Sequence, residues 1–458
     1  MGQPRRPRLW LVAALLGLGS VVAGLALWLS FDLRSARWAV APVPVPREDG
    51  RPRVVRGPYL QTLTPKSVLV RWRTDLPVEG RVAFATVANP TKRVVRESAA
   101  TREHELLLGP LAPGTAYAYD LVGPDDAPLA GGPSVTFTSP PGPASQAPVR
   151  VWALGDAGTA SEGARAVRDA YLRHAKGRLP DVWLMLGDNA YTRGTDLEYQ
   201  AAVFETYADI LARVSLWPTR GNHDQGEGLA APYFQVFSLP TRGEAGGLAS
   251  DTEAYYAFEH GNTHFVCLDS YGSDRGPEGP MVSWLRRDLA TRDARWTVVF
   301  FHHPPYSRGT HDSDRERAMI EMRKNVLPVL EEAGVDLVLT GHSHNYERSG
   351  LLAGHYGARA SFEAHHKLAS GGPGVVFEKR VGPRGGTVYV VAGASGNVGR
   401  RFAGLDHPAM DVSSATLGSV VLEISDEAIE LLYLDANATV FDRFTLRKLA
   451  APQGRRGG

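Results

Sequence analysis

The chain is almost without cysteine, and it lacks a charge excess of either sign. Cys267 is the single cysteine of 458 residues, so an internal disulfide is excluded. Its apolar surroundings, Thr263 to Leu268, predict a buried core thiol rather than a reactive one. The formal net charge of +1 gives no reason to expect a nucleic-acid partner. A hydrophobic content of 43% is ordinary for globular protein, and the length suffices for two or three domains.

Charged side chains are also absent from one long stretch near the N-terminus, Leu9–Phe31. This stretch exceeds the ~20 residues that span a bilayer as a helix. Trp10 and Trp28 lie near its ends, as interfacial aromatic residues do in membrane helices. We expect residues 1–31 to form an uncleaved transmembrane anchor, with a cleaved signal peptide as the alternative. The remaining chain would then lie outside the cytoplasm, either membrane-anchored or secreted.

A proline-rich segment at residues 32–51 predicts an extended linker, and an all-β region follows at 52–139. Short alternating runs separated by turn residues predict a small β-sandwich. Its expected strands are residues 67–73, 80–85, 104–108, 113–122 and 134–138. The run around Trp72 and the segment Leu111–Tyr119 resemble a fibronectin type III module. Because this region lacks a cluster of Asp, His or Cys, we expect it to be a spacer or a wall beside a site.

From residue 147 to residue 447 strand-like runs alternate with helical segments, which predicts an α/β domain. Helices are expected at residues 162–176 and 197–212. A further helix is expected to begin near Ser313, where Ser313 and Glu316 fit a capping box. Five apolar runs predict buried strands that each end in Asp, Asn, His or Tyr. They are residues 149–154, 181–186, 214–219, 297–301 and 335–340.

The polar groups that follow these five runs are the most informative feature of the sequence. They are Gly155-Asp156-Ala157-Gly158, Gly187-Asp188-Asn189-Ala190-Tyr191, Gly221-Asn222-His223-Asp224, His302-His303 and Gly341-His342-Ser343-His344. Ligands gather at the carboxyl ends of strands in open α/β sheets, so five loops can bring these side chains together. Each group alone fits an ordinary turn or loop cap. Their repetition predicts one shared metal site.

The candidate metal ligands are Asp156, Asp188, Tyr191, Asn222, His302, His342 and His344. One tetrahedral zinc binds about four ligands, so this larger set suits two ions that share a ligand. Asp188 is the expected bridge, because a carboxylate can bind one ion with each oxygen. Two ions ~3.5–4 Å apart can bind both the attacking and the leaving oxygen of a phosphoryl group. Tyr191 favours a trivalent ion such as Fe³⁺, because a phenol with a pKa of about 10 must lose its proton to bind strongly.

This series of motifs resembles the metallophosphoesterase superfamily, and Tyr191 with the preceding β region resembles its purple acid phosphatases. The resemblance covers roughly residues 52–447. It implies a four-layer α-β-β-α fold with two mixed sheets, and hydrolysis of phosphomonoesters by a metal-bound hydroxide. The implied ligand sets are Asp156, Asp188, Tyr191 and His344 for Fe³⁺, and Asp188, Asn222, His302 and His342 for a divalent Zn, Fe or Mn ion.

Further residues are candidates for a role in catalysis. His223 lies next to a candidate ligand and can hydrogen-bond a phosphate oxygen, and Asp224 can orient His223. His311 matches the position of the substrate-side histidine in the family it resembles. We expect His311 to be the general acid for the leaving alkoxide, with a solvated loop histidine as the alternative. His303 is expected to pack against or orient its neighbour.

The rest of the chain bears on the substrate more than on the chemistry. Residues 350–374, with three histidines, predict a surface insertion, residues 419–424 and 428–435 a hairpin, and residues 448–458 a disordered tail. A phosphodiesterase or nucleotidase would use the same ligands, and loops such as 225–250 would decide between them. A non-catalytic surface binding protein would be expected to lack Asp188 or a histidine, and none is missing. The expected partners are a phosphorylated small molecule or protein, and the membrane through residues 9–31.

Overall fold

The computed structural model describes residues 50–124, 126–142, 145–225 and 231–449. The expected anchor at 1–31, all but the last two residues of the expected linker and the tail from residue 450 lie outside them. No helix within these ranges has the length and apolar character needed to cross a membrane.

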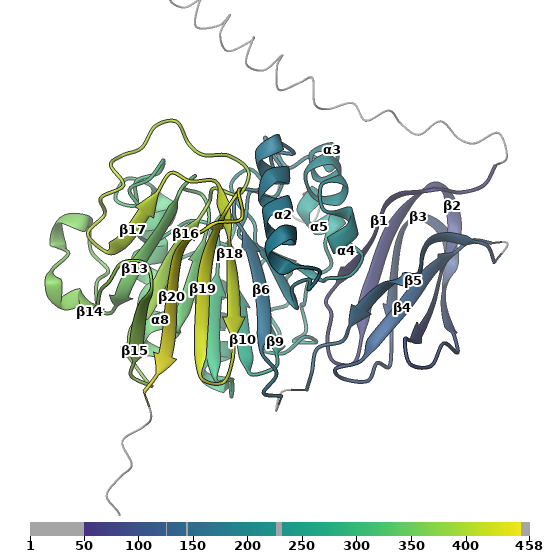
Figure 1. The fold of residues 1–458 in the computed structure, drawn as a ribbon, viewed down its shortest axis with the longest axis horizontal. Helices are drawn as coiled ribbons and strands as arrows, with labels where there is room; N and C mark the ends of the chain where they lie inside the picture. Colours follow the sequence, from purple (N-terminus) through teal and green to yellow (C-terminus); the bar gives the residue numbers. More distant parts are fainter. Residues whose placement is uncertain (1–49, 125, 143–144, 226–230, 450–458) are drawn as a thin grey trace, which may run out of the picture. The chain divides into compact units, whose positions relative to one another are not determined.

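The first module is all-β, as predicted, and it forms a five-stranded antiparallel sheet (Figure 1). Its strands are β1 Val54–Gln61, β2 Val68–Thr86, β3 Arg93–Leu108, β4 Ala116–Val122 and β5 Pro128–Thr138. The prediction of separate strands at 67–73 and 80–85 is wrong, because β2 runs through both. Register shifts between Arg73 and Val78 and between Glu79 and Arg81 bend this long strand. Its first half therefore pairs with β1 and its second half with β4.

The second module contains two mixed sheets, which confirms the predicted α/β class. In the seven-stranded sheet the order is β15-β20-β19-β18-β6-β7-β8, of which β18, β19 and β20 lie side by side in Figure 1. These strands are β6 Val149–Leu154, β7 Val182–Met185, β8 Leu216–Pro218, β15 Val375–Lys379, β18 Gly418–Ile424, β19 Ala428–Asp435 and β20 Val440–Lys448. The predicted hairpin is confirmed by the antiparallel pairing of β18 with β19.

The second sheet has eight strands in the order β14-β13-β16-β12-β11-β10-β9, with β17 paired to β13. They are β9 Tyr256–His260, β10 Thr263–Cys267, β11 Trp296–Phe300, β12 Leu337–Thr340, β13 Tyr346–Leu352, β14 Lys367–Ala369, β16 Thr387–Ala392 and β17 Met410–Ser414. Cys267 is fully buried in β10, as predicted, and burial raises the pKa of its thiol.

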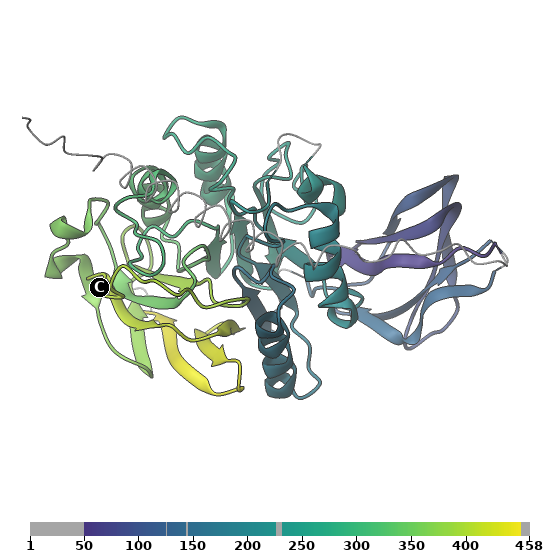
Figure 2. The same cartoon turned by 90° about the horizontal axis from the view of Figure 1, so that it is seen from above.

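Alternation along the central strands places the two sheets face to face. Along β11, Val298 and Phe300 join the core shared with the first sheet, whereas Val299 joins a second core. That second core is covered by helices α6 Pro280–Thr291 and α8 Leu327–Glu332. On the far side of the first sheet, helix α2 Glu162–Ala175 stacks Tyr171 on Trp152 of β6. Figure 2 gives a second view of these layers.

Two of the predicted helices differ from the structure. The segment expected at 197–212 is broken into α3 Asp196–Tyr199, a π-helical stretch Gln200–Glu205 and α4 Ala208–Leu211. The predicted capping box at Ser313 is wrong, because helix α7 Arg317–Glu321 begins after Glu316 and no side chain caps it. The Ser313 hydroxyl is buried without a hydrogen-bond partner among the described residues. The remaining helices are α5 Pro232–Val236, π-helical Met322–Val326, and 3₁₀ turns Arg359–Ser361 and Ala364–His366.

The expected surface insertion at 350–374 is only partly at the surface. Its first residues belong to β13, and β14 pairs with β13 at the edge of the eight-stranded sheet. His355 is buried, with its ring 5.9 Å from that of Tyr306, whereas His365 is largely exposed. The packing around Tyr306 therefore fixes this segment to the second core.

Contacts between the two modules reach the start of helix α3. Arg73 of β2 forms a bidentate pair with Asp196, at 2.7 Å and 3.0 Å, and Arg56 of β1 lies 2.9 Å from the same carboxylate. The side chain of Glu198, two residues further along the chain, accepts hydrogen bonds from the backbone N–H groups of Thr192 and Arg193. The first module thus supports the loop that follows β7.

Candidate metal centre

The candidate ligands follow the carboxyl ends of parallel strands from both sheets. Strands β6, β7 and β8 run parallel in the first sheet, and β11 and β12 run parallel in the second. Asp156 follows β6, Asp188 and Tyr191 follow β7, Asn222 follows β8, His302 follows β11, and His342 and His344 follow β12. Because the two sheets stack, the structure brings all seven predicted side chains to one place.

The backbone is strained where these strands end. Asp156, Asp188 and His342 have φ values of +57°, +52° and +65°, in the left-handed region that residues other than glycine rarely occupy. Close packing explains the neighbouring glycines. A Cβ on Gly221 would lie 2.2 Å from Oδ1 of Asp188, and one on Gly341 would lie 2.6 Å from Oδ2 of Asp156. These positions let the loops approach the carboxylates closely.

One group of ligand atoms surrounds the hydroxyl of Tyr191. Its oxygen lies 3.0 Å from Oδ1 of Asp156, 2.9 Å from Oδ2 of Asp188 and 3.2 Å from Nε2 of His344. Two ligand atoms bound at right angles to one ion, each ~2.1 Å from it, are ~3.0 Å apart. The observed separations therefore fit four ligands of a single ion.

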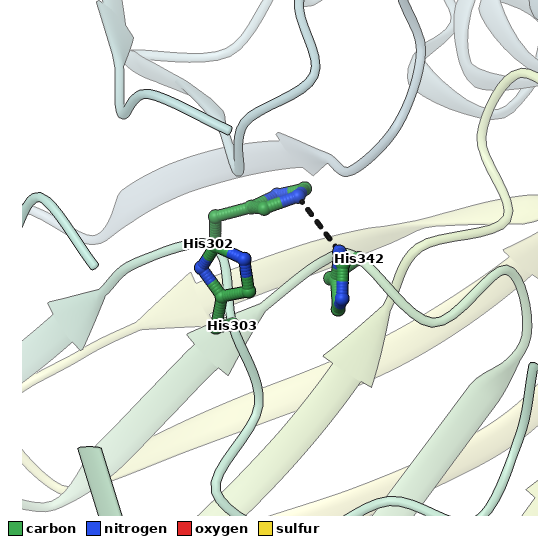
Figure 3. Close-up of side chains that lie close together, drawn as sticks. All are labelled: His302, His303 and His342. Atoms are coloured by element: carbon green, nitrogen blue, oxygen red, sulfur yellow. Dashed lines mark hydrogen bonds between the residues drawn. The ribbon is translucent and has the colours of Figure 1, made fainter. Parts of the chain in front are cut away.

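A second group of ligand atoms surrounds Nε2 of His302. This nitrogen lies 3.1 Å from Oδ1 of Asn222, 3.2 Å from Nδ1 of His342 and 3.4 Å from Oδ1 of Asp188. Figure 3 shows His302 and His342 facing each other, with His303 beside them. The two carboxylate oxygens of Asp188 thus belong to different groups, Oδ2 to the first and Oδ1 to the second.

The hydrogen bonds on the outer nitrogens of His302 and His342 indicate that the second group of ligand atoms binds a cation. Nδ1 of His302 donates to the carbonyl of Leu186 at 2.9 Å, and Nε2 of His342 lies 2.8 Å from Oε2 of Glu316. In the neutral rings Nε2 of His302 and Nδ1 of His342 are therefore unprotonated acceptors. They face each other and two acceptor oxygens, so a positive charge must lie between them, either a proton or a metal ion.

The pKa values of His302 and Tyr191 also indicate that a positive charge belongs in the site. Burial lowers the pKa of His302, but the carboxylates of Asp188 and Asp156 and the carbonyl of Leu186 together outweigh burial and raise it to about 9. Burial raises the pKa of Tyr191 well above 10, and the carboxylates of Asp156 and Asp188 raise it further. The phenol therefore keeps its proton unless a highly charged cation takes its place.

His223 and Asp224 differ in their hydrogen-bond partners and therefore in the roles open to them. The backbone N–H of His223 donates to Oδ1 of Asp188 at 2.7 Å, and Nδ1 lies 2.8 Å from the carbonyl of Thr192. Nε2 of the half-buried ring lies 4.0 Å from Oδ2 of Asp188. Asp224 does not orient this ring, contrary to the prediction. Its buried carboxylate accepts from the hydroxyl of Tyr199 at 2.6 Å and from the amides of Asn189, so it braces the loops instead.

His303 and His311 lie on the side of His342. The buried ring of His303 has its centroid 4.4 Å from that of His342 and Nδ1 3.0 Å from the hydroxyl of Ser270, in agreement with the expected packing role. The ring of His311 lies 3.8 Å from that of His342, and its Nδ1 lies 2.5 Å from Oε1 of Glu316. His311 is therefore held beside the second group rather than solvated in a free loop.

Glu316 is the residue of the site that the sequence analysis missed. Its position three residues after Ser313 suggested a helix cap, yet its carboxylate contacts two histidines of the site. Burial raises the pKa of Glu316, but hydrogen bonds from His311 and His342 outweigh it and lower the pKa to about 2. The alternating Asp and Arg residues around it carry no signal that would distinguish it.

Comparison with known proteins agrees with this geometry. A family model described as calcineurin-like phosphoesterase matches residues 149–346. The chain is 27% identical over 340 residues to probable purple acid phosphatase 20 of Arabidopsis thaliana, covering 70% of this chain and 74% of that protein. It is 31% identical over 258 residues to purple acid phosphatase 18 of the same plant, covering 54% of this chain and 53% of the relative. The chain thus spans about half the length of several curated relatives that it matches.

Solved structures show the same fold. The purple acid phosphatase PPD1 from yellow lupin seeds superposes with a TM-score of 0.67 at 16% identity, covering 87% of this chain and 74% of that one. PhoD superposes with a TM-score of 0.58 at 12% identity, covering 82% and 85%. Residues 149–346 thus match a calcineurin-like phosphoesterase domain, and the chain is similar in sequence to purple acid phosphatases.

Proposed function

We propose that this protein hydrolyses phosphoric monoesters at a dinuclear metal centre. The observation that carries the proposal is the division of Asp188, whose Oδ2 lies 2.9 Å from the Tyr191 hydroxyl while Oδ1 lies 3.4 Å from Nε2 of His302. One carboxylate could thereby be shared by two ions, an arrangement that suits two-metal phosphoryl transfer. The homology to purple acid phosphatases supports the same activity.

The two groups of ligands differ in the ion that suits them. Asp156, Asp188, Tyr191 and His344 combine two carboxylates with a phenol, and we assign them to Fe³⁺. Asp188, Asn222, His302 and His342 offer imidazole and amide ligands, and we assign them to a divalent Zn, Fe or Mn ion. Bound ions would supply a strong nucleophile at low pH and positive charge for the phosphoryl oxygens.

The chain's own residues would then handle the substrate and its protons. His223 is proposed to donate from Nε2 to a phosphoryl oxygen, because its Nδ1 is already bonded to Thr192. His311 is proposed to give a proton to the leaving oxygen, because its Nδ1 is bonded to Glu316 and its Nε2 remains available. Asp224 is given a structural role only. We further propose that the N-terminal segment places this site outside the cytoplasm.

The test compares two substrates and two variants. The purified full chain, loaded with iron and zinc, is assayed with p-nitrophenyl phosphate and bis-p-nitrophenyl phosphate across pH. Asp188→Asn removes the bridge, and Asp209→Asn makes the same change on an exposed residue of α4 as the control. Turnover of the monoester at acid pH that is lost only in Asp188→Asn supports the proposal.

Three other outcomes contradict it in different ways. Preference for the diester would keep the metal centre and change the substrate class. Two bound metal ions per chain without turnover of either ester would indicate a binding protein. A folded chain that binds no metal would overturn the proposal entirely.

A further inference from the structure

The carboxylate of Glu316 lies between two histidines that have different proposed roles. Its Oε2 is 2.8 Å from Nε2 of His342, and its Oε1 is 2.5 Å from Nδ1 of His311. The two rings are 3.8 Å apart at their centroids, so one carboxylate spans both. His342 belongs to the proposed divalent site, and His311 is the proposed acid.

These contacts determine which nitrogen of each ring faces the site. A carboxylate accepts N–H bonds, so His342 donates from Nε2 and presents its Nδ1 lone pair 3.2 Å from Nε2 of His302. His311 donates from Nδ1, so its transferable proton is on Nε2. Carboxylates that hold a metal-binding imidazole in this way commonly change metal affinity 10–100-fold when they are removed.

The backbone holds Glu316 in place for this task. Its N–H bonds to the carbonyl of Asp312 at 3.3 Å, and its carbonyl accepts from the N–H of Ile320 at 3.0 Å in the first turn of α7. The neighbouring acids are engaged elsewhere, Asp312 with Arg315 and Asp314 with Arg323. A Ser or Asp side chain at this helix start would stabilise the helix as a cap, whereas Glu316 makes no such bond.

We propose that Glu316 is a positioning residue with two roles. It orients His342 as a metal ligand and His311 as the acid that protonates the leaving group. This inference rests on the proposed function: the role of Glu316 toward His311 is tested by turnover, whereas its role toward His342 is tested by zinc affinity, which needs no turnover.

The experiment tests the role toward His342 by zinc affinity and the role toward His311 by turnover. Glu316→Ala and Glu316→Gln are compared in the full chain with Glu332→Ala, which removes an exposed acid from α8. Zinc affinity is measured by competition with a chelator. Turnover is measured for p-nitrophenyl phosphate, whose leaving group needs little protonation, and for β-glycerophosphate, whose alkoxide needs an acid. Circular dichroism and thermal melting confirm that each variant is folded.

Glu316→Ala is expected to weaken zinc binding about 10–100-fold. At saturating zinc, kcat for β-glycerophosphate is expected to fall about 10²-fold or more, and kcat for p-nitrophenyl phosphate much less, with KM little changed. Glu316→Gln keeps a single acceptor oxygen, so it is expected to restore one of the two losses. Glu332→Ala is expected to match the wild type in both measurements.

Several results would overturn the inference. Unchanged zinc affinity in Glu316→Ala would remove the role toward His342, and equal losses for both substrates would remove the role toward His311. Three ions per wild-type chain and two in Glu316→Ala would make Glu316 a ligand of a further ion. If the wild type binds two ions but hydrolyses neither ester, the proposed function fails, while the zinc measurement still decides the role toward His342.

Discussion

The hydroxyl of Tyr191 lies 2.9 Å from Oδ2 of Asp188, and both residues belong to the same short loop after β7. Burial raises the pKa of this phenol, and the carboxylates of Asp156 and Asp188 raise it further. A trivalent cation reverses that balance, because it favours the phenolate. We therefore propose that this pair is the part of the centre that would favour a ferric ion.

Replacement of Tyr191 by Phe tests this specificity. Tyr191→Phe is expected to lose the visible absorption band that a phenolate gives when bound to Fe³⁺, and to bind iron more weakly. Absorption spectra and iron content per chain measure both effects. Tyr271→Phe, at a half-buried tyrosine outside the ligand groups, should keep the band. An unchanged spectrum in Tyr191→Phe would show that the phenol is not a ligand.

The close approach of Gly221 to Asp188 predicts a second effect. Gly221→Ala would place its Cβ 2.2 Å from Oδ1 of Asp188, so the carboxylate or the loop that carries residue 221 must shift. Zinc affinity is expected to fall at least about 10-fold, since small displacements of ligands weaken metal sites. Gly142→Ala is the control, because no atom lies within 4 Å of a Cβ at that position. Equal zinc affinities would show that the loop relaxes around the added methyl group.

A buried histidine away from the centre predicts how stability depends on pH. Burial lowers the pKa of His407 to about 3, and Arg323 and His355 lower it further. Because the folded pKa lies below the unfolded value of ~6.5, the stabilising contribution is complete above pH 6.5 and is lost as the pH falls toward 3. The free energy of unfolding should decrease by up to ~1.4 kcal/mol per pH unit from this residue in that window.

Urea unfolding at pH 7 and pH 5 measures this dependence. His407→Gln is expected to reduce the difference between the two pH values, because glutamine does not titrate. His365→Gln changes an exposed histidine and should leave the difference as it is in the wild type. A difference that His407→Gln leaves unchanged would assign the pH dependence to other groups.

The contact between the modules predicts an effect on stability. Asp196→Ala leaves the guanidinium of Arg56, whose side chain is 1% exposed, without its carboxylate partner. Asp196 itself is 41% exposed, which reduces the loss, so we expect about 1–2 kcal/mol of destabilisation. Thermal unfolding measures it. Asp126→Ala removes a carboxylate that is 83% exposed and should change stability by less than ~0.5 kcal/mol. Equal effects of the two variants would contradict this explanation.

Much of the site was predictable because each ligand lies in the loop that follows an apolar strand. Asp156 and His342 are examples: a buried apolar run ends, a glycine follows, and the polar side chain comes next. The end of a strand can be recognised from local sequence. The rule that ligands gather at strand ends then predicts that these residues lie close together in space. The α/β class and helix α2 followed from the same periodicity, with Ser161 as the observed N-cap.

Features that depend on contacts between distant residues were not predictable. Glu316 fits a capping box in sequence, and only the position of His342 after β12 shows that its carboxylate is needed elsewhere. Asp224 lies next to His223, but its carboxylate points to Tyr199, which is 25 positions away in the chain. The continuity of β2 through Val78 depends on pairing with β3, and a local alternation pattern ends at the bulge.

The bond between Arg73 and Asp196 also has a consequence for the exchange of modules between proteins. A recombination event near residue 147 would separate the two arginines from the aspartate that they share. The incoming module would bring no matched pair, and the loop carrying Tyr191 would lose its brace. The two modules are therefore better treated as one unit of inheritance, and a designer who grafts a new first module should transfer Arg56 and Arg73 with it.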